Sequence, residues 1–76
     1  MEADGQQSSC PERAKLAAAV DEILTHLVEL TRTQREAFQR REESEFARMD
    51  RELENAIGEK ERRVGALNQH ERAHGC

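Results

Sequence analysis

The polar run Arg40-Arg41-Glu42-Glu43-Ser44-Glu45 lies near the middle of this 76-residue chain. On either side of it, apolar residues recur at steps of three and four, which is the spacing of one face of an amphipathic helix. If the run forms a turn, the two segments fold back on each other as a helical hairpin. If the run is itself helical, the chain is one long rod. The conformation of this run therefore decides the fold.

The segment before the run opens with a helix-start signature, Ser9-Cys10-Pro11-Glu12, which fits the Ser-x-x-Glu capping box with proline in the first turn. The segment after the run restarts the apolar stripe at Phe46, and Gly75 supplies a C-terminal stop. These signals predict a disordered tail over residues 1–8 and one helical unit over 9–76, with helices over about 10–41 and 45–73 and a turn over 41–45. The stripes predict these core and interface residues: Leu16, Val20, Ile23, Leu24, Leu27, Leu30, Phe38, Phe46, Met49, Leu53, Ile57, Val64 and Leu67.

Two observations favour the rod and two favour the hairpin. The run contains no Gly or Pro, and an eleven-residue apolar repeat from Leu16 to Met49 would carry one stripe through it. In contrast, Ser44 is a good N-cap for a second helix. Reflection of the chain about the run also places apolar residues opposite one another, for example Phe38 opposite Phe46. We therefore expect an all-α antiparallel hairpin, with a single long helix in a coiled coil as the alternative.

The composition indicates that such a hairpin self-associates. Only 36% of the residues are hydrophobic, and many of those are alanines, so one chain of this length buries little apolar surface. Two helices cover only one flank of each stripe, and a second hairpin would cover the rest in a four-helix bundle. We expect a small helical interaction or assembly protein that binds itself and a helical segment of a partner. The layout of long arm, polar turn and long arm resembles that of small bacterial helical chaperones such as those of the flagellar export system.

Charge and hydropathy exclude other classes. The net charge is −4, acidic and basic residues are mixed throughout, and aromatic residues make up 3% of the chain, so the clustered basic surface of a nucleic-acid-binding protein is missing. The most apolar segment, Leu16 to Leu30, is interrupted by acidic residues and is too polar to span a bilayer. The acidic N-terminus does not resemble a secretory signal. We expect a cytoplasmic protein that binds neither membranes nor nucleic acid.

The string His70-Glu71-Arg72-Ala73-His74 is similar to the zincin motif, in which two histidines one helical turn apart bind zinc and the glutamate acts as general base. The similarity covers five residues, and no third ligand follows at the usual downstream position. We therefore expect no enzymatic activity, and keep a zinc hydrolase with Glu71 as base as the weaker alternative.

In a hairpin, Cys10 would lie beside the C-terminal end of the second helix. Cys10, His70, His74 and Cys76 could then form a Cys2His2 zinc site. The same proximity permits a disulfide between the two cysteines or a thiol-redox role, whereas fraying would leave both as exposed thiols. The sequence leaves these alternatives open.

Two further residues have expected positions. His26 is expected to be a partly buried helix residue rather than a metal ligand, because the Glu-x-x-His spacing of bundle metal sites does not occur there. Lys60 is expected near the seam between the helices, opposite Thr25 and His26.

Overall fold

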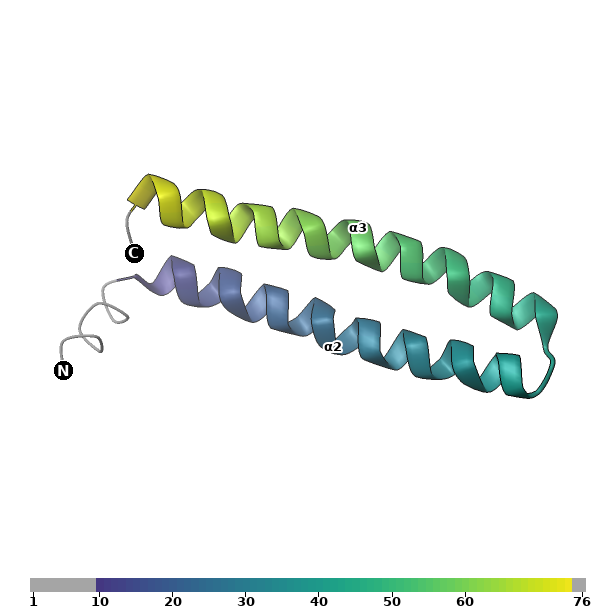
Figure 1. The fold of residues 1–76 in the computed structure, drawn as a ribbon. Helices are drawn as coiled ribbons and strands as arrows, with labels where there is room; N and C mark the ends of the chain where they lie inside the picture. The colour runs from purple at the N-terminus through teal and green to yellow at the C-terminus, as the bar shows by residue number, and fades with distance from the viewer. Residues whose placement is uncertain (1–9, 75–76) are drawn as a thin grey trace.

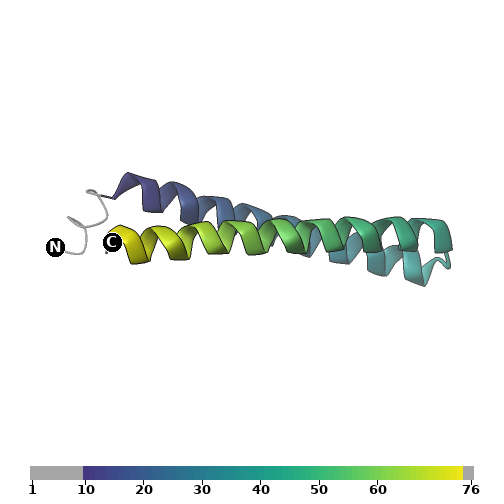
Figure 2. The ribbon, with the colours of Figure 1, turned by 90° about the horizontal axis from the view of Figure 1, so that it is seen from above.

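The computed structural model describes residues 10–74, which form two antiparallel helices (Figure 1). Helix α2 spans Pro11–Gln39 and helix α3 spans Glu43–His74. The helices contact each other along the hairpin and cross at a shallow angle (Figure 2). The Cα trace measures 53 × 22 × 11 Å, so the hairpin is one helix thick. The expected helical hairpin is confirmed, and the continuous rod is excluded.

The turn is built without glycine. Arg40, the C-cap of α2, is in the right-handed helical region, and Arg41 then takes a left-handed conformation with φ 62°. The N–H of Glu42 donates to the carbonyl oxygen of Ala37 at 2.9 Å, and the N–H of Arg41 donates to that of Phe38 at 3.1 Å. These two bonds are those of a Schellman motif, which satisfies the last carbonyls of a helix. An arginine occupies the position where glycine is usual, so the absence of Gly from the run does not prevent a turn.

Neither helix has the N-cap residue that the sequence predicted, Ser9 for the first helix and Ser44 for the second. Pro11 is the first residue of α2 and Cys10 is its N-cap, without a hydrogen bond from the side chain. Ser9, the cap predicted by the capping box, lies outside the described residues. Helix α3 begins at Glu43, before Ser44, and the N–H of Phe46 donates to the carbonyl oxygen of Glu42. Because the Schellman motif reverses the chain within three residues, α3 starts two residues earlier than the predicted position 45.

The core of the hairpin is a thin line of residues between the helices. Ile23, Leu30, Met49 and Ala56 form one buried cluster, against which Leu27 and Leu53 pack. Ala37 is 2% exposed, next to the turn. Alanines at these positions let the two backbones approach closely.

The predicted core residues fall into three classes of burial. Buried are Ile23, Leu30 and Met49. Half-buried are Leu16, Val20, Leu27, Leu53, Val64 and Leu67. Exposed are Leu24, Phe38, Phe46 and Ile57. The apolar stripe is therefore wider than the contact between the two helices.

The register of the helices is symmetric about Glu42. The rings of Phe38 and Phe46, equally distant from Glu42 in sequence, have centroids 6.1 Å apart. Further along, Gln34 Nε2 donates to Asp50 Oδ1 at 3.3 Å. This register confirms the predicted apposition of Phe38 and Phe46 and fixes which residues share one level of the hairpin.

Candidate functional site

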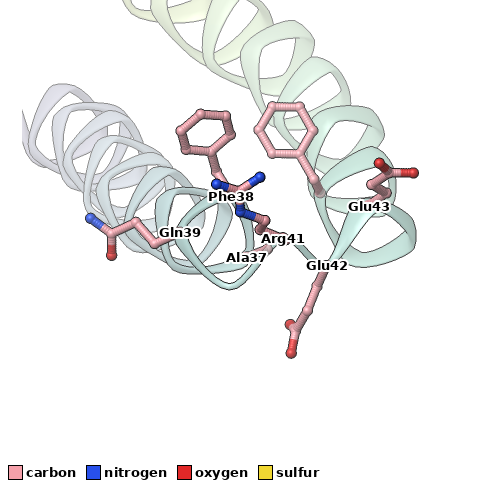
Figure 3. A pocket seen from close by; sticks show the side chains of 7 residues that line it. Ala37, Phe38, Gln39, Arg41, Glu42 and Glu43 are labelled. Atoms are coloured by element: carbon pink, nitrogen blue, oxygen red, sulfur yellow. The ribbon is translucent and has the colours of Figure 1, made fainter.

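One broad side of the hairpin carries its exposed large apolar residues. Phe38 and Phe46 mark this side at the turn, where the Phe38 side chain points away from Glu42 (Figure 3). Leu24 precedes Phe38 by about four helical turns, and Ile57 follows Phe46 by about three, so both lie on the same side as the rings. Val28 is one turn from Leu24 and completes the set. We call this surface the apolar face; it consists of Leu24, Val28, Phe38, Phe46 and Ile57.

The sequence prediction missed Val28, which is 64% exposed. The signal was present, because Val28 follows Leu24 at the i,i+4 spacing of helix neighbours. The predicted apolar stripe omits Val28 because it includes only the residues expected at one contact surface. Val28 lies beyond the seam between the helices and widens the stripe away from it.

The two edges of the apolar face carry opposite charge. On the α2 edge, Arg32 and Arg35 are exposed and line a shallow hollow together with Leu27, Val28 and Thr31. On the α3 edge, the exposed side chains Asp50, Glu54 and Glu61 are acidic. The face is therefore apolar along its middle, basic along one edge and acidic along the other.

The opposite side of the hairpin is covered by ion pairs. Arg63 donates to Glu59 Oε2 at 2.9 Å, to Glu22 Oε1 at 3.1 Å and to the backbone carbonyl of Ala19 at 2.8 Å. Hydrogen bonds from Arg62 and then from Arg63 lower the pKa of the Glu59 carboxyl below its ordinary value. The carboxylates of Glu59 and Glu22 in turn raise the pKa of Arg63. The charges of Glu22, Glu59, Arg62 and Arg63 are therefore paired within the hairpin.

Nearer the turn, the same side holds a second ion-pair group. Arg48 bonds Glu45 at 2.6 Å and Glu52 at 3.4 Å, and a hydrogen bond from Arg48 to Glu45 is the main cause of its raised pKa. We call the side that carries Glu22, Arg48, Glu59 and Arg63 the charged face. A single hairpin thus presents two different surfaces. The large apolar side chains of the apolar face are exposed on it.

The open end of the hairpin brings Cys10 and His70 together. Cys10 is 6% exposed, and its Sγ lies 3.3 Å from Nε2 of His70 on α3. Cys10 is a disulfide-bonded cysteine rather than a free thiol. One turn further along α2, Arg13 Nε donates to Glu71 Oε2 at 2.8 Å. The end of the hairpin is therefore held by contacts from both helices.

The structure does not describe the side chains of the other two predicted ligands, His74 and Cys76. Helix α3 continues to His74, but the side chain of His74 and all of Cys76 lie outside the described part of the chain. Within residues 10–74, no group of three or more His, Cys, Asp or Glu side chains could hold a metal ion. The carboxylate of Glu71, the expected base of the zincin-like string, forms an ion pair with Arg13.

Of the two further residues, His26 differs from its predicted burial and Lys60 does not. His26 is exposed, not partly buried, and lines an open hollow with Glu22, Glu29 and Arg63. Lys60 is half-buried near the seam, but it is Arg63 that reaches across to α2 on the side of Glu22. An arginine bridges this gap because its planar guanidinium carries several donors and can serve three acceptors at once.

Comparison with known proteins gives no match among protein families, curated proteins or solved structures. Within the described residues, neither helix is long and apolar enough to cross a membrane.

Proposed function

We propose that this protein is a small helical assembly module, in which the apolar face of one hairpin packs against the apolar face of a second copy to form a four-helix bundle. The observation that carries the proposal is the exposure of Leu24 (44%), Val28 (64%) and Ile57 (42%) on one side of a folded hairpin. Large aliphatic side chains gathered on one surface commonly mark a site of association.

The thickness of the hairpin supports this. Stable domains consist of two or more packed layers around a core, whereas this chain forms one layer of two helices with a Cα thickness of 11 Å. A second layer buries the apolar face and leaves both charged faces in water. It does so without disturbing the ion pairs of Arg48 and Arg63.

The spacing of the side chains on the apolar face fits a second copy of the same hairpin. By the symmetry of the hairpin about Glu42, Ile57 on α3 lies at a level between Leu24 and Val28 on α2. If α2 of one hairpin lies over α3 of the other with the turns at the same end, each Ile57 enters the space between Leu24 and Val28 of its partner. This is the knobs-into-holes arrangement of helix bundles.

The turns and the charges select the same orientation. With turn over turn, Phe38 of one copy covers Phe46 of the other, whereas the reversed orientation leaves both phenylalanine pairs in water. The basic edge of α2, at Arg32 and Arg35, then faces the acidic edge of the partner's α3, at Asp50 and Glu54. Complementary edges of this kind fix orientation and register more than they add affinity.

Sedimentation equilibrium of Leu24→Glu, compared with wild type, tests the proposal. We expect the wild-type chain to dimerise and the variant to dissociate, with the dimer dissociation constant raised by at least about a hundredfold, because each site occurs twice in a symmetric dimer. Thr33→Glu is the matched control: Thr33 is an exposed α2 residue on the charged face, and this change leaves the dimer intact. A wild-type chain that sediments as a folded monomer, or that dimerises equally well after Leu24→Glu, contradicts the proposal.

A spin label tests the orientation. In a chain with both cysteines replaced by serine, Gln39→Cys places one label beside the turn. With turn over turn, the two labels of a dimer lie close together. In the reversed orientation they are separated by nearly the 53 Å length of the hairpin. Binding of a separate amphipathic helix to a monomer through the same face would instead assign a heterologous partner.

A further inference from the structure

The turn of the hairpin is short and strained. Arg40, Arg41 and Glu42 alone connect the last residue of α2 to the first residue of α3. Arg41 has φ 62°, a left-handed conformation that brings the Cβ atom too close to the following carbonyl oxygen. Short connections under strain favour the exchange of elements between copies of a chain. We propose that this turn is a hinge through which two chains exchange helices: each chain straightens into one continuous helix, and its α2 packs against α3 of the other chain.

The residues of the hinge are compatible with a continuous helix. The run from Arg40 to Glu45 contains no Gly or Pro, and arginine and glutamate are good helix formers. An apolar residue recurs every eleven positions from Leu16 to Met49, so a helix through the hinge carries one stripe along its whole length. The turn is therefore held by the contact between α2 and α3, and not by residue types that require a turn.

Helix exchange keeps the contacts that hold α2 against α3. The buried cluster of Ile23, Leu30, Met49 and Ala56 draws two residues from each helix, and it forms in the same way when the helices belong to different chains. The two backbone hydrogen bonds of the Schellman motif are lost, and those of a continuous helix replace them. A single straight chain would lack the buried cluster. The single chain is therefore a hairpin, and opening requires a second copy.

The middle of the exchanged dimer has matched partners. The hairpin pairs residues equally distant from Glu42, and helix exchange keeps this register between the two chains. Phe38 of each chain then lies opposite Phe46 of the other. By the same reflection, Arg41 of each chain lies opposite Glu43 of the other. Pairs of opposite charge at matching positions favour the antiparallel orientation.

The exchanged dimer presents two apolar faces on one particle. A continuous helix over residues 11–74 is about 95 Å long at about 1.5 Å per residue. The hairpin measures 53 Å. Each half of the exchanged dimer repeats the pair of α2 and α3, so each half carries one apolar face and the dimer can link two further hairpins. The exchange itself does not use the apolar face and does not depend on the proposed four-helix bundle.

A crosslink on the charged face tests the exchange. In a chain with both native cysteines replaced by serine, Glu22→Cys and Arg63→Cys put thiols on two side chains that contact each other between α2 and α3. A short bifunctional maleimide joins them within one chain in a hairpin and between two chains in an exchanged dimer. After refolding from urea at high protein concentration, we expect covalent dimers in denaturing electrophoresis. Crosslinks within single chains only would overturn the proposal.

Two steps separate the exchange from association of whole hairpins. Opening breaks the contacts between the helices and is slow, so the refolded sample is diluted before the crosslinker is added, and separate molecules do not react. Leu24→Glu is then added to the same chain. We expect the covalent dimers to persist, because this change acts on the apolar face and the contacts between α2 and α3 are the same in both forms. Covalent dimers that disappear with Leu24→Glu would overturn the exchange.

Arg41 supplies a matched pair of variants for the hinge. Arg41→Gly removes the strain of the turn and weakens a continuous helix, whereas Arg41→Ala keeps the strain and favours the helix. In the crosslinking chain, we expect Arg41→Gly to lower the association constant of the exchanged dimer by at least about a hundredfold, because each dimer contains two hinges. Arg41→Ala keeps the constant at the starting value or raises it. Circular dichroism shows whether both variants are helical, and equal yields of covalent dimer from the two would overturn the role of the hinge.

Discussion

Arg63 of α3 donates a hydrogen bond from Nη1 to the backbone carbonyl oxygen of Ala19 on α2, at 2.8 Å. The same guanidinium holds Glu22 of α2 and Glu59 of its own helix. Because it joins a backbone acceptor to side chains of both helices, Arg63 ties them together in the half of the hairpin away from the turn. Its neighbour Arg62 bonds Glu59 within α3.

We expect Arg63→Met to lower the stability of the hairpin and Arg62→Met to lower it less. The first change removes contacts that join α2 to α3, whereas the second removes an exposed pair within one helix, and such pairs add little. Urea denaturation followed by circular dichroism gives the midpoint for each variant. Equal midpoints for the two variants would show that the contact between Arg63 and Ala19 contributes nothing.

Glu59 predicts a loss of stability in acid. Its carboxyl has a lowered pKa in the folded chain because Arg62 and Arg63 donate hydrogen bonds to the charged form. A carboxyl of this kind stabilises the fold at pH values above its unfolded pKa of about 4.3, and the contribution is lost as the pH falls through the lower folded value. Glu59→Gln removes this dependence. The difference in melting temperature between wild type and Glu59→Gln should therefore be largest near neutral pH and vanish in strong acid; a constant difference contradicts the assignment.

The left-handed residue of the turn predicts a stabilising change. Arg41 has φ 62°, a region in which a side chain is strained and glycine is not. We expect Arg41→Gly to raise the free energy of unfolding by about 1 kcal/mol, measured by urea denaturation. Arg40→Gly is the matched control, because Arg40 has φ −88° in the helical region and glycine there should destabilise by about 1 kcal/mol. A turn that gains nothing from Arg41→Gly would not be strained.

Ala37 predicts the effect of overfilling the seam. It is 2% exposed and lies where α2 and α3 come together before the turn. We expect Ala37→Leu to lower the free energy of unfolding by about 1 to 3 kcal/mol, because the added carbons push the helices apart. Ala47→Leu, at an exposed position of α3, should change it by less than about 0.5 kcal/mol. Equal effects at the two positions would mean that the seam has room for a larger side chain.

The sequence by itself determined the helical class and the approximate extent of both helices. Helical spacing of apolar residues is a local property, and so is the helix-start signal that predicted Pro11 in the first turn, where the structure has it as the first residue of α2. The reflection that placed Phe38 opposite Phe46 was also readable from the sequence, because antiparallel helices joined by a short turn must pair residues equally distant from it. The buried positions Ile23, Leu30 and Met49 followed from the same pattern.

The tertiary structure alone decided which part of the stripe is covered. Leu24 and Ile57 have the same apolar character as Ile23 and Met49, yet one pair is exposed and the other buried, because a hairpin of two helices closes only one line of contact. It also decided that Arg41 turns the chain without glycine, that Arg63 rather than Lys60 bridges the helices, and that Cys10 meets His70. These outcomes depend on the distance and rotation of one helix against the other, and local periodicity contains no information about either.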